Sequence, residues 1–147
     1  MTKGILIQNA TIVNENKIFK GDILIENEII TKISSKIKPT KNVEIINAEG
    51  KFLIPGFIDD QVHFREPGLT HKANIATESR AAIAGGITTF IEMPNTVPQA
   101  TTQDLLEDKF KIAAADSYAN YSFMFGGTND NLEELLKTDP KKVAGIK

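Results

Sequence analysis

Side chains that commonly bind metals and anions alternate along one short stretch of the sequence. Within residues 59–65, every second position is polar, and these positions are Asp59, Gln61, His63 and Arg65. Because successive side chains of a β-strand point to opposite faces, the four would share one face. Burying four polar groups without a purpose would cost free energy, which favours a binding or catalytic face. A face turned to solvent at a strand end explains the same pattern, so both interpretations stay open.

Two further positions carry groups suited to a binding site. Asn95, after Met93-Pro94, would present both a hydrogen-bond donor and an acceptor, although Pro-Asn is also common in plain turns. Lys147 follows Ala144-Gly145-Ile146. A lysine buried there would lose its charge readily and could take up carbon dioxide, giving a carbamate that bridges two cations. A solvated lysine is the alternative, and we expect His71 to be a surface residue.

The elements that must position these residues alternate between strand and helix from Ile54-Pro55-Gly56 onward. Such alternation indicates a parallel sheet with right-handed crossovers, in which active residues lie at the carboxyl ends of the strands. The predicted strands cover 57–64, 87–93, 121–125 and the region from 143, and the predicted helices cover 72–84, 102–117 and 129–137.

The parallel sheet could be an open doubly wound sheet or a barrel. Arg65-Glu66-Pro67-Gly68 after the first strand is not a phosphate-binding glycine fingerprint, which argues against the open sheet. A barrel needs eight strands and about 250 residues. We therefore predict the first four units of a (β/α)₈ TIM-type barrel over residues 54–147, in a sequence that is the N-terminal part of a longer protein.

Residues 1–53 have a different sequence pattern from the rest of the chain. Short runs rich in isoleucine are punctuated by turn residues, and Ile23 to Ile29 alternate around Glu26-Asn27-Glu28, which is typical of a β-hairpin. The pattern predicts a small antiparallel β unit as a separate N-terminal domain.

Composition limits the classes of function. The 147 residues have a net charge of −2, which gives no electrostatic case for binding nucleic acid or membranes. The absence of cysteine excludes disulfides, thiolate catalysis and Cys-ligated zinc, leaving histidine and carboxylates as ordinary metal ligands. The start of the sequence has no signal-peptide pattern, and no apolar run is long enough to span a bilayer. We expect a cytoplasmic protein.

Several motifs together resemble the dihydroorotases and related cyclic amidohydrolases. The stretches that carry the resemblance are 54–59 (IPGFID), 62–68 (VHFREPG), 81–89 (AAIAGGITT), 93–96 (MPNT) and 143–147 (VAGIK). They span most of the chain and keep the family's order. The resemblance implies a metallo-dependent hydrolase barrel with a small β-sandwich, of which residues 1–53 would be one portion.

The resemblance also implies an activity. It is the zinc-dependent, reversible hydrolysis of (S)-dihydroorotate to N-carbamoyl-L-aspartate, a step of pyrimidine biosynthesis, on a small-molecule substrate. His63 would be a zinc ligand, Lys147 a carboxylated lysine that bridges two ions, and Asp59 a residue that orients the ligands. Arg65 and Asn95 resemble the pair that binds the substrate carboxylate, for which a planar guanidinium is well suited. A homodimer is compatible with the resemblance, although the sequence does not specify the oligomeric state.

One position departs from the family pattern, which has two histidines on the first strand. Gln61 occupies the first of them, and an amide oxygen is a weaker ligand for zinc than imidazole. The number of metal ions, one or two, is therefore left open. Two alternatives also remain: an allantoinase or dihydropyrimidinase, and a catalytically inactive dihydroorotase-like subunit that acts as a scaffold.

Overall fold

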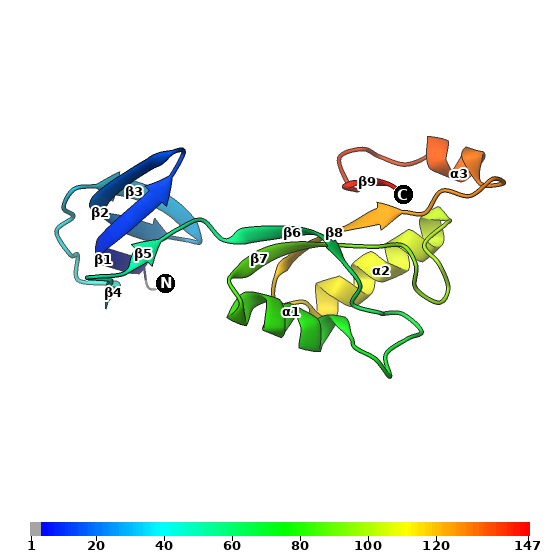
Figure 1. Cartoon of the computed structure of the whole chain (residues 1–147), viewed down its shortest axis with the longest axis horizontal. Coiled ribbons are helices and arrows are strands. Elements are labelled where there is room, and N and C mark those ends of the chain that lie inside the picture. Colours follow the sequence, from blue (N-terminus) through cyan, green and yellow to red (C-terminus); the bar gives the residue numbers. More distant parts are fainter. Residues whose placement is uncertain (1–3) are drawn as a thin grey trace. The chain divides into compact units, whose positions relative to one another are not determined.

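The computed structural model of the chain describes residues 4–147. The chain divides into two compact units, unit 1 (Met1–Pro55) and unit 2 (Gly56–Lys147). Figure 1 shows both units, coloured along the sequence from blue at the N-terminus to red at the C-terminus. No helix in residues 4–147 is long and apolar enough to cross a membrane.

Unit 1 is a five-stranded mixed sheet. Its strands are β1 (Gly4–Asn14), β2 (Lys17–Glu26), β3 (Ile29–Ser34), β4 (Val43–Asn47) and β5 (Phe52–Leu53). Antiparallel pairing joins β1 to β2 and β2 to β3, whereas β4 and β5 pair with β1 in parallel. The expectation of a purely antiparallel unit was therefore wrong. The connection over residues 35–42 is long enough to return the chain to the far edge of β1 in the same direction, which a tight turn cannot do.

The hairpin predicted in unit 1 is present. Asn27 and Glu28 connect β2 to β3 with φ angles of 50° and 66°. Two successive residues in the left-handed region make the turn whose twist matches that of paired strands.

One buried carboxylate organises unit 1. Asp22 is 3% exposed and accepts backbone hydrogen bonds from Asn9 (2.9 Å) and Ile37 (2.8 Å). Asn9 has a φ of 62° at the bulge in β1, and Ile37 lies in the connection to β4. Burial acts to raise the pKa of Asp22, but the hydrogen bonds from Asn9, Ile37 and Gln8 and the charge of Lys36 together outweigh it, so the pKa lies below its usual value. The ionised carboxylate thus holds a bulge and a loop in place.

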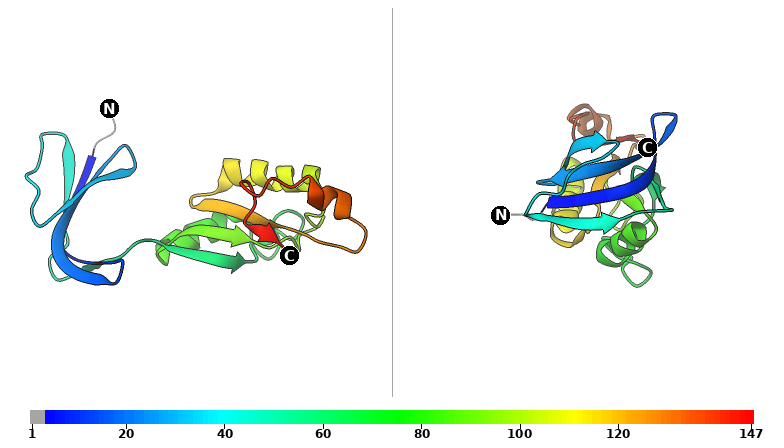
Figure 2. Two further views of the ribbon diagram at one scale, coloured as in Figure 1. Left: turned by 90° about the horizontal axis from the view of Figure 1, so that it is seen from above. Right: turned by 90° about the vertical axis from the view of Figure 1, so that its left-hand side faces the viewer.

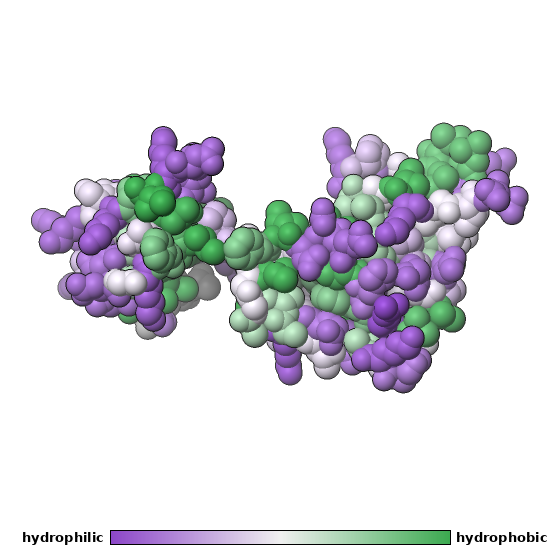
Figure 3. All heavy atoms as spheres, viewed as in Figure 1, coloured by the Kyte–Doolittle hydropathy of each residue, from purple (hydrophilic) through white to green (hydrophobic). Residues whose placement is uncertain are grey.

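Many large apolar side chains of unit 1 are exposed. They include Ile18, Ile29, Ile30, Ile33, Ile45, Ile46 and Phe52. Figure 3 shows hydrophobic surface over this unit and, in unit 2, over α3 (Leu132–Leu136). The described residues form a single sheet here, so the β-sandwich predicted for residues 1–53 stays a prediction.

Unit 2 is a curled parallel sheet with helices on one face. The strands are β6 (Phe57–Val62), β7 (Ile87–Glu92), β8 (Asn120–Phe125) and β9 (Gly145–Ile146), in the order β6-β7-β8-β9. Helix α1 (Ile75–Ala84) contacts β7, helix α2 (Gln103–Asp116) contacts β8, and the two helices contact each other. Figures 1 and 2 show both helices against the same side of the sheet. The predicted alternation of strand and helix is confirmed. The architecture seen in residues 56–147 is that of half a barrel.

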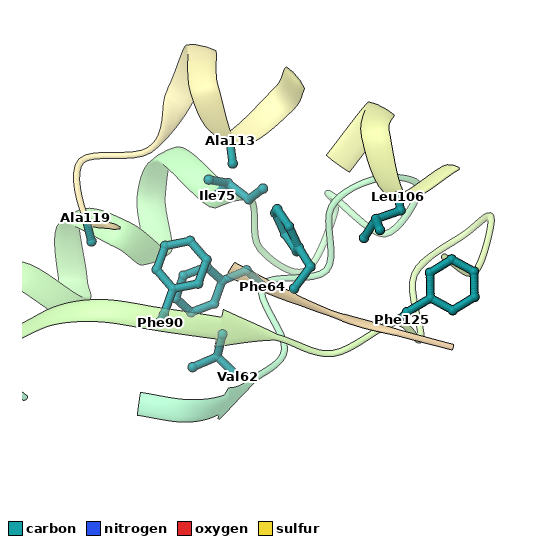
Figure 4. Close-up of a cluster of buried hydrophobic side chains, with 9 residues drawn as sticks. Val62, Phe64, Ile75, Phe90, Leu106, Ala113, Ala119 and Phe125 are labelled. Carbon is teal, nitrogen blue, oxygen red and sulfur yellow. The ribbon is translucent and has the colours of Figure 1, made fainter. Parts of the chain in front are cut away.

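The core of unit 2 lies between the sheet and the two helices, as Figure 4 shows. Phe90 of β7 and Phe123 of β8 are fully buried, and the rings of Phe64 and Phe90 are 4.5 Å apart. Ile75 from α1 and Leu106 from α2 close the cluster from the helix side. Burial of Val62 and Phe64 in this core turns the alternate positions of the first strand away from it.

Helix starts follow their capping residues. Thr102, where the predicted helix begins, caps α2, with its hydroxyl accepting from Leu105 N at 3.3 Å. α1 begins at Ile75 rather than at the predicted Lys72. Asn74 forms a capping box with Thr77, and Glu66 accepts a hydrogen bond from Ile75 N at 2.8 Å. The Asn74 carboxamide and the Glu66 carboxylate accept hydrogen bonds from backbone N–H groups of the first turn, and they thereby fix where α1 begins.

The loops that follow β6 and β7 are in direct contact. Val97 N donates to Pro67 O at 3.1 Å. Gly68 has a φ of 82°, and a Cβ added to it would lie 1.9 Å from the Val97 carbonyl oxygen. Only glycine allows the two loops to approach so closely.

We predict that Asp22→Asn lowers the free energy of unfolding by about 1–3 kcal/mol at neutral pH, because one charge-assisted acceptor is lost. The pKa of Asp22 is lowered by folding, so its contribution is present above the unfolded pKa of about 3.9 and is lost as the pH falls through the folded pKa. Denaturant unfolding of both proteins from neutral pH to about pH 2.5 should show the difference shrinking with acid. The exposed Glu49→Gln is the control. Equal stability of Asp22→Asn and wild type at pH 7 would contradict this role.

We also predict that Gly68→Ala destabilises the protein more than Gly86→Ala does. Gly86 has a similar φ of 89° but nothing within 4 Å of an added Cβ, so alanine there adds only backbone strain of about 1–2 kcal/mol. Alanine at position 68 adds a collision with the Val97 backbone, which should cost about 1–3 kcal/mol more. Denaturant unfolding of the two variants measures the difference, and equal losses would show that the loops separate freely.

Candidate active site at the strand ends

A pocket of about 300 Å³ lies at the carboxyl ends of the strands of unit 2. Its lining comes from each of the four strand ends in turn: His63, Met93, Pro94, Asn95, Gln99, Thr101, Gly126, Gly127 and Lys147. Three residues singled out in the sequence, His63, Asn95 and Lys147, are thus brought together although up to 84 positions separate them. This is the place where parallel α/β sheets and barrels carry their active sites.

The imidazole of His63 is oriented by Asn95. His63 Nδ1 lies 2.9 Å from Asn95 Oδ1. With a carbonyl oxygen as acceptor, Nδ1 carries the proton and Nε2 keeps its lone pair for a ligand. Asn95 still has its amide N–H groups to donate, and both side chains are exposed towards the pocket. The pair therefore offers one lone pair and amide donors in a single site.

Lys147 lines the same pocket from the end of β9. Its backbone continues the parallel ladder, with Lys147 N donating to Phe125 O at 2.8 Å and Gly127 N donating to Lys147 O at 2.7 Å. The side chain is exposed rather than buried in this structure. Its carboxylation, which we expected from burial, stays a prediction.

Arg65 follows His63 by two residues but is not among the residues that line the pocket. Its side chain is half-buried, and its φ of 71° places a non-glycine residue in the left-handed region. Leu69 N donates to Arg65 O at 3.0 Å, and Glu66 is tied to the start of α1. The backbone that carries Arg65 is therefore fixed on both sides, at some conformational cost.

Asp59 and Gln61 lie further down β6. Asp59 is half-buried and accepts from Gln61 N at 3.2 Å, and Gln61 is exposed. Neither residue lines the pocket. Their predicted roles, in orienting ligands and as the doubtful ligand, stay predictions. His71 is exposed, as expected.

Sequence analysis missed a buried ion pair beside the site. Lys109 Nζ of α2 lies 2.5 Å from Glu92 Oε2 of β7, and both side chains are 1% exposed. Burial raises the pKa of Glu92 and lowers that of Lys109, while the attraction between them opposes both shifts. The sequence did hold a signal, because each charge shares a strand or helix face with buried apolar residues. Glu92 is on the same face of β7 as Phe90, and Lys109 is between Leu106 and Ala113 on the buried face of α2.

The residues of the pocket fit a metal ion only in part. His63 Nε2 is a suitable donor with an oriented ring, and Lys147 shares its pocket. Residues 4–147 contain no group of three or more His, Cys, Asp or Glu side chains able to hold an ion. The described residues therefore offer one suitable donor, His63 Nε2, and do not complete a ligand set.

Comparison with known proteins agrees with this geometry. Residues 50–137 match the family model described as dihydro-orotase-like. Over 129 residues the chain is 43% identical to a dihydroorotase of Methanosarcina acetivorans, covering 88% of this chain and 27% of that protein. Over 97 residues it is 53% identical to a dihydroorotase of Carboxydothermus hydrogenoformans, covering 65% of this chain and 22% of that protein.

The chain also resembles solved structures of other cyclic amidohydrolases, the hydantoinases. The L-hydantoinase (dihydropyrimidinase) from Arthrobacter aurescens superposes with a TM-score of 0.91 at 31% identity, over 97% of this chain and 32% of that one. A D-hydantoinase structure gives a TM-score of 0.77 at 28% identity, over 91% and 30%.

The chain spans about a quarter of the length of these curated dihydroorotases. Within that span the family match covers more than half of the chain and every pocket-lining residue except Lys147. The resemblance drawn from the sequence motifs is confirmed, and the chain belongs to the dihydro-orotase-like family.

Proposed function

We propose that the protein is a cyclic amidohydrolase that reversibly hydrolyses (S)-dihydroorotate to N-carbamoyl-L-aspartate, as in pyrimidine biosynthesis. The observation that carries the proposal is the convergence of His63, Asn95 and Lys147 in one pocket, with His63 Nδ1 bonded to Asn95 Oδ1. The names of the relatives support the reaction class. We further propose that unit 2 is half of a complete (β/α)₈ barrel, on its likeness to the hydantoinase structures.

Substrate binding would depend on Arg65 and Asn95. Asn95 Oδ1 is occupied by His63, which leaves the amide N–H groups to donate to a carboxylate. Arg65, half-buried on the adjacent loop, would add a charged planar donor pair. Together they favour a ring that bears a carboxylate over an uncharged ring.

Zinc is the cofactor we propose, in one or two ions. His63 would hold it through Nε2, and Lys147 would do so as a carbamate formed from its neutral amine and carbon dioxide with release of a proton. Asp59 would orient this end of β6, and Gln61 would be at most a weak ligand. When bound, zinc supplies Lewis acidity to the ring carbonyl and acidifies a water molecule.

Two alternatives have specific support. The hydantoinase and dihydropyrimidinase structures favour an amidohydrolase for uncharged rings. The exposed Gln61, where the family has histidine, favours an inactive scaffold subunit. A cytoplasmic location and a homodimer remain predictions.

We predict that Arg65→Met in the full-length protein lowers kcat/KM for dihydroorotate by the equivalent of about 2–4 kcal/mol, because the charge-assisted hydrogen bonds from Arg65 to the substrate are lost. Metal content should not change. Arg80→Met is the control, since Arg80 packs on Tyr118 on the outer side of α1. Steady-state kinetics test this, and full activity of Arg65→Met would exclude the carboxylate-binding role.

We predict that Lys147→Ala in the full-length protein lowers the zinc content per chain and removes nearly all activity, because the bridging anion is lost. Lys142→Ala, a nearby exposed lysine, should change neither. Elemental analysis gives the zinc content independently of turnover. Full zinc content and wild-type turnover in Lys147→Ala would rule out the carbamate.

A further inference from the structure

Burying the charged pair Glu92–Lys109 in a small core costs desolvation free energy. Both side chains are 1% exposed, and Lys109 Nζ lies 4.9 Å from the ring centroid of Phe123. The contact is short but poorly directed, since Glu92 Oε2 lacks a hydrogen bond of good geometry among the described residues. An apolar pair of similar size would usually give equal or greater stability. Stability alone therefore does not explain why the pair is there.

Each member of the pair reaches one loop of the site. Lys109 Nζ donates to Met93 O at 2.9 Å, and Met93 lines the pocket two residues before Asn95. The backbone N–H of Arg65 lies close enough to the Glu92 carboxylate to oppose the rise in its pKa. That N–H belongs to the residue held at a φ of 71°. One ion pair thus connects the loops after β6 and β7.

We infer that Glu92 and Lys109 are positioning residues, which hold Arg65 and Asn95 at the spacing needed to bind one substrate carboxylate. Glu92 fixes the backbone of Arg65, and Lys109 fixes the peptide that leads to Asn95. Because the pair is shielded from water, its two contacts are stronger than they would be on the surface. The inference rests on the proposed function for the identity of the substrate, but not for the backbone contacts themselves.

The test uses the full-length protein with Glu92→Met and Lys109→Met combined. The double variant removes both charges together, which avoids leaving one of them buried without a partner. Asp108→Met with Lys111→Met is the matched control, since that pair lies 3.0 Å apart on the same helix but is exposed. A second variant, Glu92→Gln with Lys109→Met, keeps an acceptor for the Arg65 N–H and serves as a conservative rescue.

We expect the apolar double variant to stay folded and to raise KM for dihydroorotate about 10- to 100-fold, with kcat changed less than about threefold. Hydrogen exchange of the segment 64–69 should quicken, whereas the Glu92→Gln variant should restore its protection and part of the KM. The control pair should change neither quantity. A purely structural role would instead lower the melting temperature and the active fraction at constant KM.

The outcomes separate the two proposals. If the wild-type protein does not turn over dihydroorotate, the proposed function fails, and exchange of segment 64–69 still tests the pair. If the wild type is active while the double variant keeps both its KM and the exchange rate of this segment, the positioning inference is overturned. Should the apolar variant fail to fold, the Glu92→Gln variant decides: normal exchange at 64–69 with a raised KM supports the inference, and normal values of both overturn it.

Discussion

The candidate site depends on the parallel register of β6 to β9. In this register all four carboxyl ends meet at one edge, and the hydrogen-bond ladder continues past the strands into the site. Met93 N donates to Val62 O at 3.0 Å, and Lys147 N donates to Phe125 O at 2.8 Å. The ladder therefore fixes the backbone directly beside His63, Asn95 and Lys147. The core of Phe64, Phe90 and Phe123 holds the sheet in this register from the helix side.

The sequence was sufficient for the order and type of the elements in unit 2. Strand and helix periods differ strongly there, and Thr102 and Gly85 mark helix ends by local chemistry. It was insufficient where a distant residue decides. α1 begins at Ile75 because Glu66, nine positions earlier, binds its first N–H. Likewise β4 joins β1 in parallel because of the path of a loop, which no local pattern encodes.

The sequence indicated three of the residues that line the pocket, His63, Asn95 and Lys147, but not the contacts between them. Alternation along β6 singled out His63, position after predicted strands singled out Asn95 and Lys147, and motif resemblance added their roles. That Asn95 orients His63 depends on a 2.9 Å contact between residues 32 positions apart, which no local pattern encodes. Glu92 and Lys109 were missed because a charged residue inside an apolar period is normally expected to face solvent.

The two sets of relatives bear on different parts of the molecule. A TM-score of 0.91 to a hydantoinase describes the backbone, which related enzymes share whatever ring they open. The group that a ring must carry is decided by side chains at the strand ends. In the proposed function, the half-buried guanidinium of Arg65 and the amide N–H groups of Asn95 both donate to an acceptor on the ring. A carboxylate supplies that acceptor with matching planarity and charge. The proposed carboxylate-bearing substrate is therefore consistent with the name of the relatives at 43% and 53% identity, which are dihydroorotases.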